Sequence, residues 1–98
     1  MSTEAPQIAD HPERHRYELT LDGKLAARIE YRLKDGHLVD LIHTEVDPAF
    51  EGRGLAGKIA TFALDDARTQ GRKVIATCEY IQRFLQKHPE YQDLAAAR

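Results

Sequence analysis

The sequence of 98 residues contains no tryptophan and one cysteine, Cys78. A single cysteine cannot form an internal disulfide, and no CxxC pair or cluster of cysteines and histidines indicates a metal site. No apolar run approaches the length of a membrane span, and residues 1–15 lack the hydrophobic region of a secretory signal. We therefore expect a cytoplasmic protein with no membrane association and no bound metal.

The sequence also has little excess charge of either sign. Its 14 Lys and Arg side chains are balanced by 16 Asp and Glu side chains, which gives a net charge of −2. Proteins that bind nucleic acid usually carry a clear basic excess, so this balance argues against that class. A hydrophobic fraction of 42% with 31% charged residues is typical of a globular domain. A chain of this length builds one hydrophobic core, and we expect one small domain.

The first half of the chain predicts β-hairpins. Residues 1–14 show no periodicity, and we expect a flexible N-terminal segment before a domain that spans residues 15–98. From Tyr17 onward apolar and polar residues alternate in two segments, each followed by an Asp-Gly turn, which indicates β-strands, and a third strand follows the second turn. The third segment, 37–46, is apolar on both faces. We therefore expect a three-stranded antiparallel meander with this third strand near the centre of the sheet.

The second half predicts a helix, a strand and a helix. Apolar residues recur at helical spacing from Leu55 to about Gln70, Lys73–Thr77 is rich in β-branched residues, and Tyr80–Lys87 has an apolar face. Short connections in this order favour a right-handed crossover, so Lys73–Thr77 should pair in parallel with the third strand. The expected fold class is α+β, with residues 90–98 as a frayed helical turn.

The connection between the third strand and the first helix contains Gly52, Gly54 and Gly57. Glycines let the backbone approach an anion, and the first turn of a helix presents unpaired N–H groups at the positive end of its dipole. Arg53 and Lys58 add positive charge. The pattern favours a pyrophosphate site, although a tight strand-to-helix joint also uses glycines. No Ser or Thr follows the lysine, as a P-loop requires, and the N-terminal hairpins do not fit a dinucleotide fold.

The segment Glu51-Gly52-Arg53-Gly54-Leu55-Ala56 resembles the cofactor motif Q/R-x-x-G-x-G/A of the GNAT N-acetyltransferase superfamily, and it departs from that motif at Glu51. Together with Cys78 and the ending Lys87-His88-Pro89-Glu90-Tyr91, it looks like the small YjdJ-type branch. The resemblance covers about Tyr17 to Leu94. It implies a GNAT-like fold, acetyl-CoA as cofactor, and acetyl transfer to a primary amine of a small molecule or a protein lysine.

The resemblance also implies that the pantetheine arm of the cofactor lies between the third strand and the parallel strand, against backbone N–H groups near Thr44 to Val46. The glycine turn would hold the pyrophosphate, and the last helix would meet the 3′-phosphate. The cofactor-binding residues expected on this basis are Thr44, Val46, Gly52, Arg53, Gly54, Leu55, Ala56, Gly57, Lys58, Cys78, Arg83, Lys87 and His88.

Four side chains are candidates for catalysis. His43 and Glu45 share one face of the third strand and are candidate bases, Glu45 through a water molecule; either can instead be an ordinary surface residue. Cys78 precedes a helix whose N–H groups would stabilise a thiolate, so it is a candidate nucleophile, an acid, or a small buried side chain. Tyr80 is the alternative acid for the departing thiolate, since GNAT proteins often use a tyrosine on this helix.

Two other functions stay open. The absence of an unambiguous base and the departure at Glu51 favour a CoA-binding module without catalysis, and the glycine turn also fits an interaction domain that binds nothing there. A chain this short leaves no room for a separate acceptor domain. We therefore expect the acceptor site to be a shallow surface or to be shared in a dimer, in a monomer or a small homo-oligomer.

Overall fold

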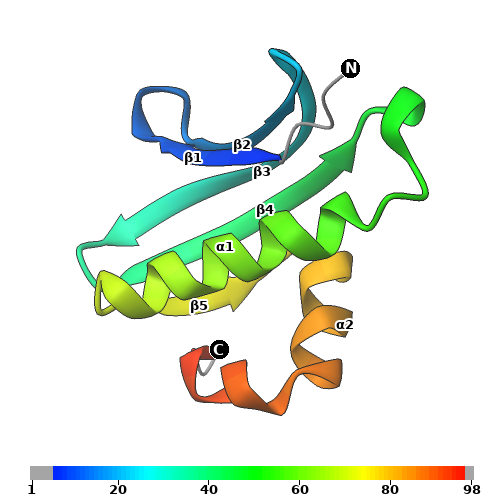
Figure 1. Ribbon diagram of the computed structural model, residues 1–98. Coiled ribbons are helices and arrows are strands. Elements are labelled where there is room, and N and C mark those ends of the chain that lie inside the picture. Colours follow the sequence, from blue (N-terminus) through cyan, green and yellow to red (C-terminus); the bar gives the residue numbers. More distant parts are fainter. Residues whose placement is uncertain (1–5, 97–98) are drawn as a thin grey trace.

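A five-stranded sheet in the order β1-β2-β3-β4-β5 organises residues 6–96, the part of the chain that the computed structural model describes (Figure 1). The strands are β1 (Gln7–His11), β2 (Arg16–Leu21), β3 (Lys24–Asp35), β4 (Leu38–Val46) and β5 (Lys73–Ala76). The α-helices are α1 (Leu55–Thr69) and α2 (Glu79–Lys87), and the 3₁₀ turns are η1 (Pro12–Arg14), η2 (Pro48–Phe50) and η3 (Pro89–Leu94). β1 to β4 pair antiparallel and β5 pairs parallel to β4, which confirms the α+β class and the crossover.

The N-terminal part differs from the sequence expectation. Residues 7–11 are not a flexible lead-in but the edge strand β1, so the antiparallel meander has four strands. Tertiary contacts hold this strand: Ile8 packs against the core, and the Tyr31 hydroxyl donates a hydrogen bond of 2.6 Å to Asp10. The two apolar residues of this segment, Ile8 and Ala9, are adjacent, so the sequence shows no alternation. The remainder of the expected segment, residues 1–5, lies outside the described residues.

Two chemically different faces result from the pairing of the strands. Tyr17, Ile29 and Thr44 are register partners across β2, β3 and β4, and their side chains share the face that α1 covers. The α1 residues that complete the core are Leu55, Ile59, Ala60, Ala63, Leu64 and Ala67. The buried Tyr17 hydroxyl donates a 2.7 Å hydrogen bond to Asp66 of the same helix. Figure 1 shows α1 crossing in front of the sheet, with α2 beside the end of β5.

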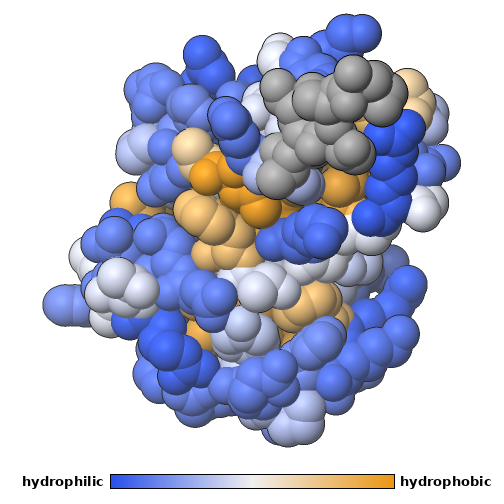
Figure 2. Space-filling view, in the orientation of Figure 1, coloured by the Kyte–Doolittle hydropathy of each residue, from blue (hydrophilic) through white to orange (hydrophobic). Residues whose placement is uncertain are grey.

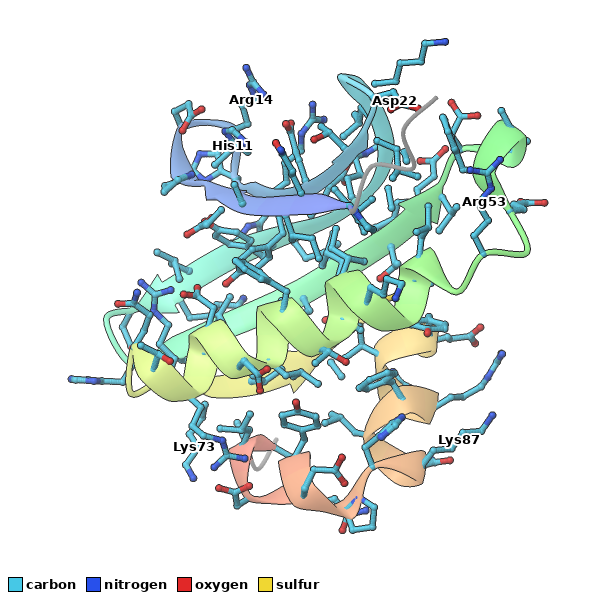
Figure 3. The ribbon with its side chains drawn as sticks, in the orientation of Figure 1. His11, Arg14, Asp22, Arg53, Lys73 and Lys87 are labelled. Carbon is cyan, nitrogen blue, oxygen red and sulfur yellow. The ribbon has the colours of Figure 1, made fainter. Side chains whose placement is uncertain are left out.

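A buried carboxylate anchors the opposite face near β1. Glu18 is only 6% exposed, and it accepts hydrogen bonds from Arg14 at 3.0 Å and Arg16 at 2.7 Å, with His11 Nε2 at 3.4 Å. Burial alone would raise the pKa of Glu18, but the hydrogen bonds from the two guanidinium groups outweigh it and lower the pKa below its ordinary value. The cluster joins β1, η1 and β2, and His11 and Arg14 lie together at that end of the sheet (Figure 3).

Irregularities in the pairing determine where the sheet opens. The register between β3 and β4 shifts between Glu30 and Tyr31, which leaves Ile42 as an extra residue in β4. β5 pairs with β4 only from Leu38 to Leu41. The next two N–H groups, of Thr77 and Cys78, both donate to the carbonyl of Leu41, at 3.1 and 3.0 Å. The chain then turns into α2, so the two strands separate just where the extra residue lies.

Residues after η3 lie against the outer edge of β5. Val74 and Ala95 form an isolated parallel bridge, and the Ala96 N–H donates to the Val74 carbonyl at 2.8 Å. The expected frayed helical turn over 90–98 is therefore a 3₁₀ turn followed by this contact, as far as residue 96. No helix in the described range is long and apolar enough to cross a membrane.

We expect Glu18→Gln to lower the free energy of unfolding by about 2 kcal/mol at pH 7, because it removes a charged acceptor from two arginines. The wild-type advantage is fully present above the ordinary pKa of 4.5 and is lost as the pH falls through the lower pKa of the folded state. Urea unfolding at several pH values measures both effects. Glu79→Gln, at an exposed position, is the control with a small effect; an equal loss in both variants would contradict the role of Glu18.

Candidate active site

The first turn of α1 lacks a side-chain cap. Gly54 is the N-cap residue in the left-handed region, at φ 72°, and it has no side chain that could accept from the helix. The Lys58 N–H donates to the Gly54 carbonyl at 3.2 Å, and helix geometry leaves the three preceding N–H groups, of residues 55–57, without a partner within the helix. These donors and the helix dipole together favour an anion at this end.

Two adjoining grooves extend from this helix end to α2. The larger, of about 610 Å³, is lined by Pro6, Ile8, Gly54, Gly57, Lys58, Thr61, Phe84 and His88. The smaller, of about 300 Å³, is lined by Gly57, Tyr80, Arg83, Phe84, Lys87 and His88. Figure 2 shows apolar surface in the middle of this face, bordered by polar side chains. We call the two together the α1–α2 groove.

Six of the thirteen predicted cofactor-binding residues meet in the α1–α2 groove. Gly54, Gly57 and Lys58 come from the N-cap and first turns of α1, and Arg83, Lys87 and His88 come from α2 and its C-cap. The side chain of Leu55 is buried in the core, so only its backbone faces the helix end. The guanidinium of Arg53 lies 5.3 Å from the centre of the Phe50 ring. The family motif has Gln or Arg at the position of Glu51, which could contact a phosphate. Lys58 is better placed than Arg53 to make that contact in this chain.

The open edge of β4 lies next to the N-terminus of α2. Cys78 is the N-cap residue of α2 and is buried, and its Sγ lies 3.3 Å from the Thr44 hydroxyl on β4. Between residues 6 and 96, no strand pairs with β4 beyond Leu41 on this side, so Thr44 and Val46 belong to an unpaired edge. Glu79 does not approach the thiol, since its side chain is 83% exposed and lies 3.6 Å from Arg83.

Tyr80 links this edge to the α1–α2 groove. A methyl group placed on Gly57 would lie 3.7 Å from the Tyr80 hydroxyl, which brings the phenol to the first turn of α1. Burial raises the pKa of Tyr80, and the neighbouring Cys78 adds to the rise. The phenol is therefore protonated at neutral pH. Among the described residues its hydroxyl has no hydrogen-bond partner, which leaves the proton available to a ligand.

His43 and Glu45 lie on the other face of the sheet from Thr44. Their register partners are Glu30 and Arg28, and the His43 Nε2 is 3.5 Å from a Glu45 oxygen. Arg28 donates to the same carboxylate at 2.6 Å. The structure thus divides the four catalytic candidates into two pairs: Cys78 and Tyr80 by the groove, and His43 and Glu45 behind the open edge of β4.

Sequence comparison assigns this arrangement to a family. A family model described as GCN5-related N-acetyl-transferase matches residues 16–94. The chain belongs to the GCN5-related N-acetyltransferase family. It is 36% identical to Protein NATD1 of Homo sapiens over 86 residues, which is 86% of this chain and 76% of that protein. It is 34% identical to Protein NATD1 of Gallus gallus over 84 residues, 85% of this chain and 76% of that protein.

Solved structures agree with this assignment. A GCN5-like protein from Staphylococcus aureus superposes with a TM-score of 0.72 at 25% identity, over 94% of this chain and 89% of its own. A GNAT family acetyltransferase from Elizabethkingia anophelis with acetyl-CoA bound shares the fold, with a TM-score of 0.59 at 14% identity, over 78% of this chain and 51% of its own. The protein is therefore a GNAT acetyltransferase, whose cofactor is acetyl-CoA.

The donor set of the α1–α2 groove fits this cofactor. The uncapped N–H groups at Gly54 and three cations, Lys58, Arg83 and Lys87, suit phosphate groups. Arg53 and Lys87 lie on the side of the molecule where α1 begins (Figure 3). When bound, acetyl-CoA supplies an acyl group activated as a thioester. The chain's own residues must hold the diphosphate and orient the carbonyl at the open edge of β4. They must also remove a proton from the amine and donate one to the departing sulfur.

Sequence reasoning missed several lining residues. Pro6 and Ile8 belong to the N-terminal segment that we expect to be flexible, and Thr61 and Phe84 are not among the predicted binding residues. The helical spacing of Thr61 with Gly57 and Lys58 places all three on one side of α1, which is a signal that the sequence does contain. The contribution of β1 had no such signal.

We expect Gly57→Ala to change stability and affinity in opposite directions. Alanine favours the helix and makes only an ordinary contact with Tyr80, so the free energy of unfolding should rise by about 0.5 kcal/mol. The added methyl group occupies the groove, and CoA should bind about threefold more weakly or worse. Thermal unfolding and calorimetry measure the two effects. Gly36→Ala, in open space at the β3–β4 turn, is the control; unchanged affinity in Gly57→Ala would argue against a cofactor at this place.

Proposed function

We propose that the protein transfers the acetyl group of acetyl-CoA directly to a primary amine, of a small molecule or of a protein lysine. One observation carries the proposal: the uncapped N-terminus of α1 and the open edge of β4 flank the same α2 residues, Cys78 and Tyr80. An anion site and a row of backbone groups are then joined by a potential proton donor. These are the three parts that transfer from a thioester needs.

Binding and orientation come from the backbone and from cations. N–H groups of residues 55–57 receive the diphosphate, and the side chain of Lys58 reaches it from the same helix turn. N–H groups of the β4 edge between Thr44 and Val46 bind along the pantetheine arm and stabilise negative charge on the thioester oxygen. Two mostly buried walls, at Leu55 and Cys78, keep water from this edge.

Tyr80 acts as the acid. The departing CoA sulfur must receive a proton, and the raised pKa of Tyr80 keeps its phenol protonated at neutral pH. The position of its hydroxyl beside Gly57 puts it between the anion site and Cys78. Cys78 is the weaker candidate, because its thiol already donates to Thr44.

His43 acts as the base for the incoming amine. Its side chain is 55% exposed on the face behind the open edge, so an amine can approach it from solvent. Glu45 is less suited, since its carboxylate is held by Arg28 at 2.6 Å. It instead orients the His43 ring, and the amine proton leaves through His43 to solvent.

Cys78 serves as a wall of the thioester site. Its N-cap position supports the alternative of an acetyl-cysteine intermediate, but its thiol is buried and already donates to the Thr44 hydroxyl. We also infer that the chain belongs to the small YjdJ-type branch, on the grounds of Cys78 and the segment His88-Pro89-Glu90-Tyr91, and that it works as a monomer or a small homo-oligomer.

We expect release of free CoA thiol from acetyl-CoA to depend on an added primary amine. A panel of small amines and lysine-containing peptides, assayed for thiol release, measures this and identifies the acceptor. Incubation with acetyl-CoA alone should leave Cys78 unmodified by mass spectrometry, and Cys78→Ala should keep most of the activity. An acetyl group on Cys78 would contradict direct transfer. If no amine in the panel raised thiol release above background, the proposed activity would be contradicted.

We expect Tyr80→Phe to lower kcat by about 100-fold with little change in KM, because it removes a proton donor and keeps the ring. Its stability should be unchanged, since the hydroxyl bonds to no described residue. The matched control is Tyr91→Phe, which removes a buried hydroxyl that donates 2.7 Å to Asp65. That control should lose about 1 kcal/mol of stability and keep kcat. Equal kcat in Tyr80→Phe and wild type would eliminate Tyr80 as the acid.

A further inference from the structure

The His88 ring at the C-terminal end of α2 is held in one orientation by its neighbours. It stacks on Phe84, with ring centroids 4.0 Å apart and an angle of 25° between the planes. Phe84 is itself buried and is flanked by Tyr80 and Tyr91, with ring centroids at 6.1 and 6.3 Å. The His88 Nδ1 lies 3.4 Å from a Glu90 oxygen. These contacts fix both the tilt and the rotation of the imidazole.

One face of this ring is open. Phe84 covers the inner face, yet the His88 side chain remains 40% exposed. His88 lines both parts of the α1–α2 groove, opposite Lys58 and Thr61 of α1. A flat molecule entering the groove can therefore lie against the open face of the imidazole.

The surroundings favour a nucleotide rather than a simple aromatic ligand. Arg83 and Lys87 of α2 carry positive charge along the smaller part of the groove, which His88 also lines. Cys78 and His88 lie at opposite ends of α2, roughly 15 Å apart at 1.5 Å per residue. A ligand with its thioester at Cys78 and a flat group on His88 would therefore span the length of α2.

We propose that the open face of His88 is the stacking platform for the adenine of CoA, and that Arg83 and Lys87 bind the neighbouring ribose phosphate. The inference rests on the proposed orientation of acetyl-CoA, with its diphosphate at Gly54 and its thioester at Cys78. It reassigns His88 from a phosphate ligand to a purine ligand. A nucleobase stacks on a flat ring of any polarity. A ring whose inner face is stacked on Phe84 and whose Nδ1 lies beside Glu90 is poorly oriented to bind a phosphate.

The experiment compares CoA binding to wild type, His88→Ala and His88→Phe by calorimetry, with S-acetylpantetheine as a ligand that lacks the adenosine. Stacking of one base on a side-chain ring predicts a loss of roughly 5- to 50-fold in CoA affinity for His88→Ala. His88→Phe retains the flat surface and should stay within about threefold of wild type. Neither variant should change the affinity for S-acetylpantetheine. His37→Ala, an exposed histidine on the β3–β4 turn, is the matched control.

A second measurement needs no variant. Titration of the wild-type protein with adenosine 3′,5′-bisphosphate should move the His88 ring proton resonances upfield, as a stacked purine does, and leave those of His37 unchanged. CoA affinity equal in wild type and His88→Ala, or unmoved His88 resonances at saturation, overturns the platform while the proposed function stands. Failure of the wild-type protein to bind CoA at all overturns both.

Discussion

The site depends on the early end of the parallel pairing between β4 and β5. Two successive N–H groups, of Thr77 and Cys78, share the Leu41 carbonyl, and this shared bond turns the chain out of the sheet. β4 continues to Val46 without a partner on that side. A continuous sheet would satisfy these backbone groups internally. The separation leaves them for a ligand and places the start of α2 beside them.

Each helix of this small protein has both a structural and a binding part. The buried side of α1, from Leu55 to Ala67, covers the sheet, while its first turn presents backbone donors. Ile81 of α2 lies fully in the core, and the same helix carries Tyr80 and the Phe84–His88 stack toward the groove. A destabilising change in either helix is therefore expected to alter binding too, so that affinity and stability have to be measured together.

The sequence was most informative where local chemistry decides the structure. The Asp22-Gly23 turn, with φ values of 51° and 77°, the glycine N-cap at Gly54 and the position of Cys78 before a helix all follow from backbone preferences. The extra residues Ala26 and Ile42 do not, because a bulge is chosen by the fit of neighbouring strands. This is why Leu25 is exposed despite its apparent apolar alternation. The stacking of Phe84 on His88 fits their i, i+4 spacing. Whether the outer face of the His88 ring stays open depends instead on where α1 packs.

The short contact between Ala95–Ala96 and Val74 bears on whether the outer edge of β5 can pair with another chain. β5 is an edge strand of the sheet, and an exposed edge strand can pair with a strand from a second chain. The bridge to Ala95 and the hydrogen bond from Ala96 cover part of this edge. A strand from a second chain would have to displace these contacts before it could pair with β5 at Val74.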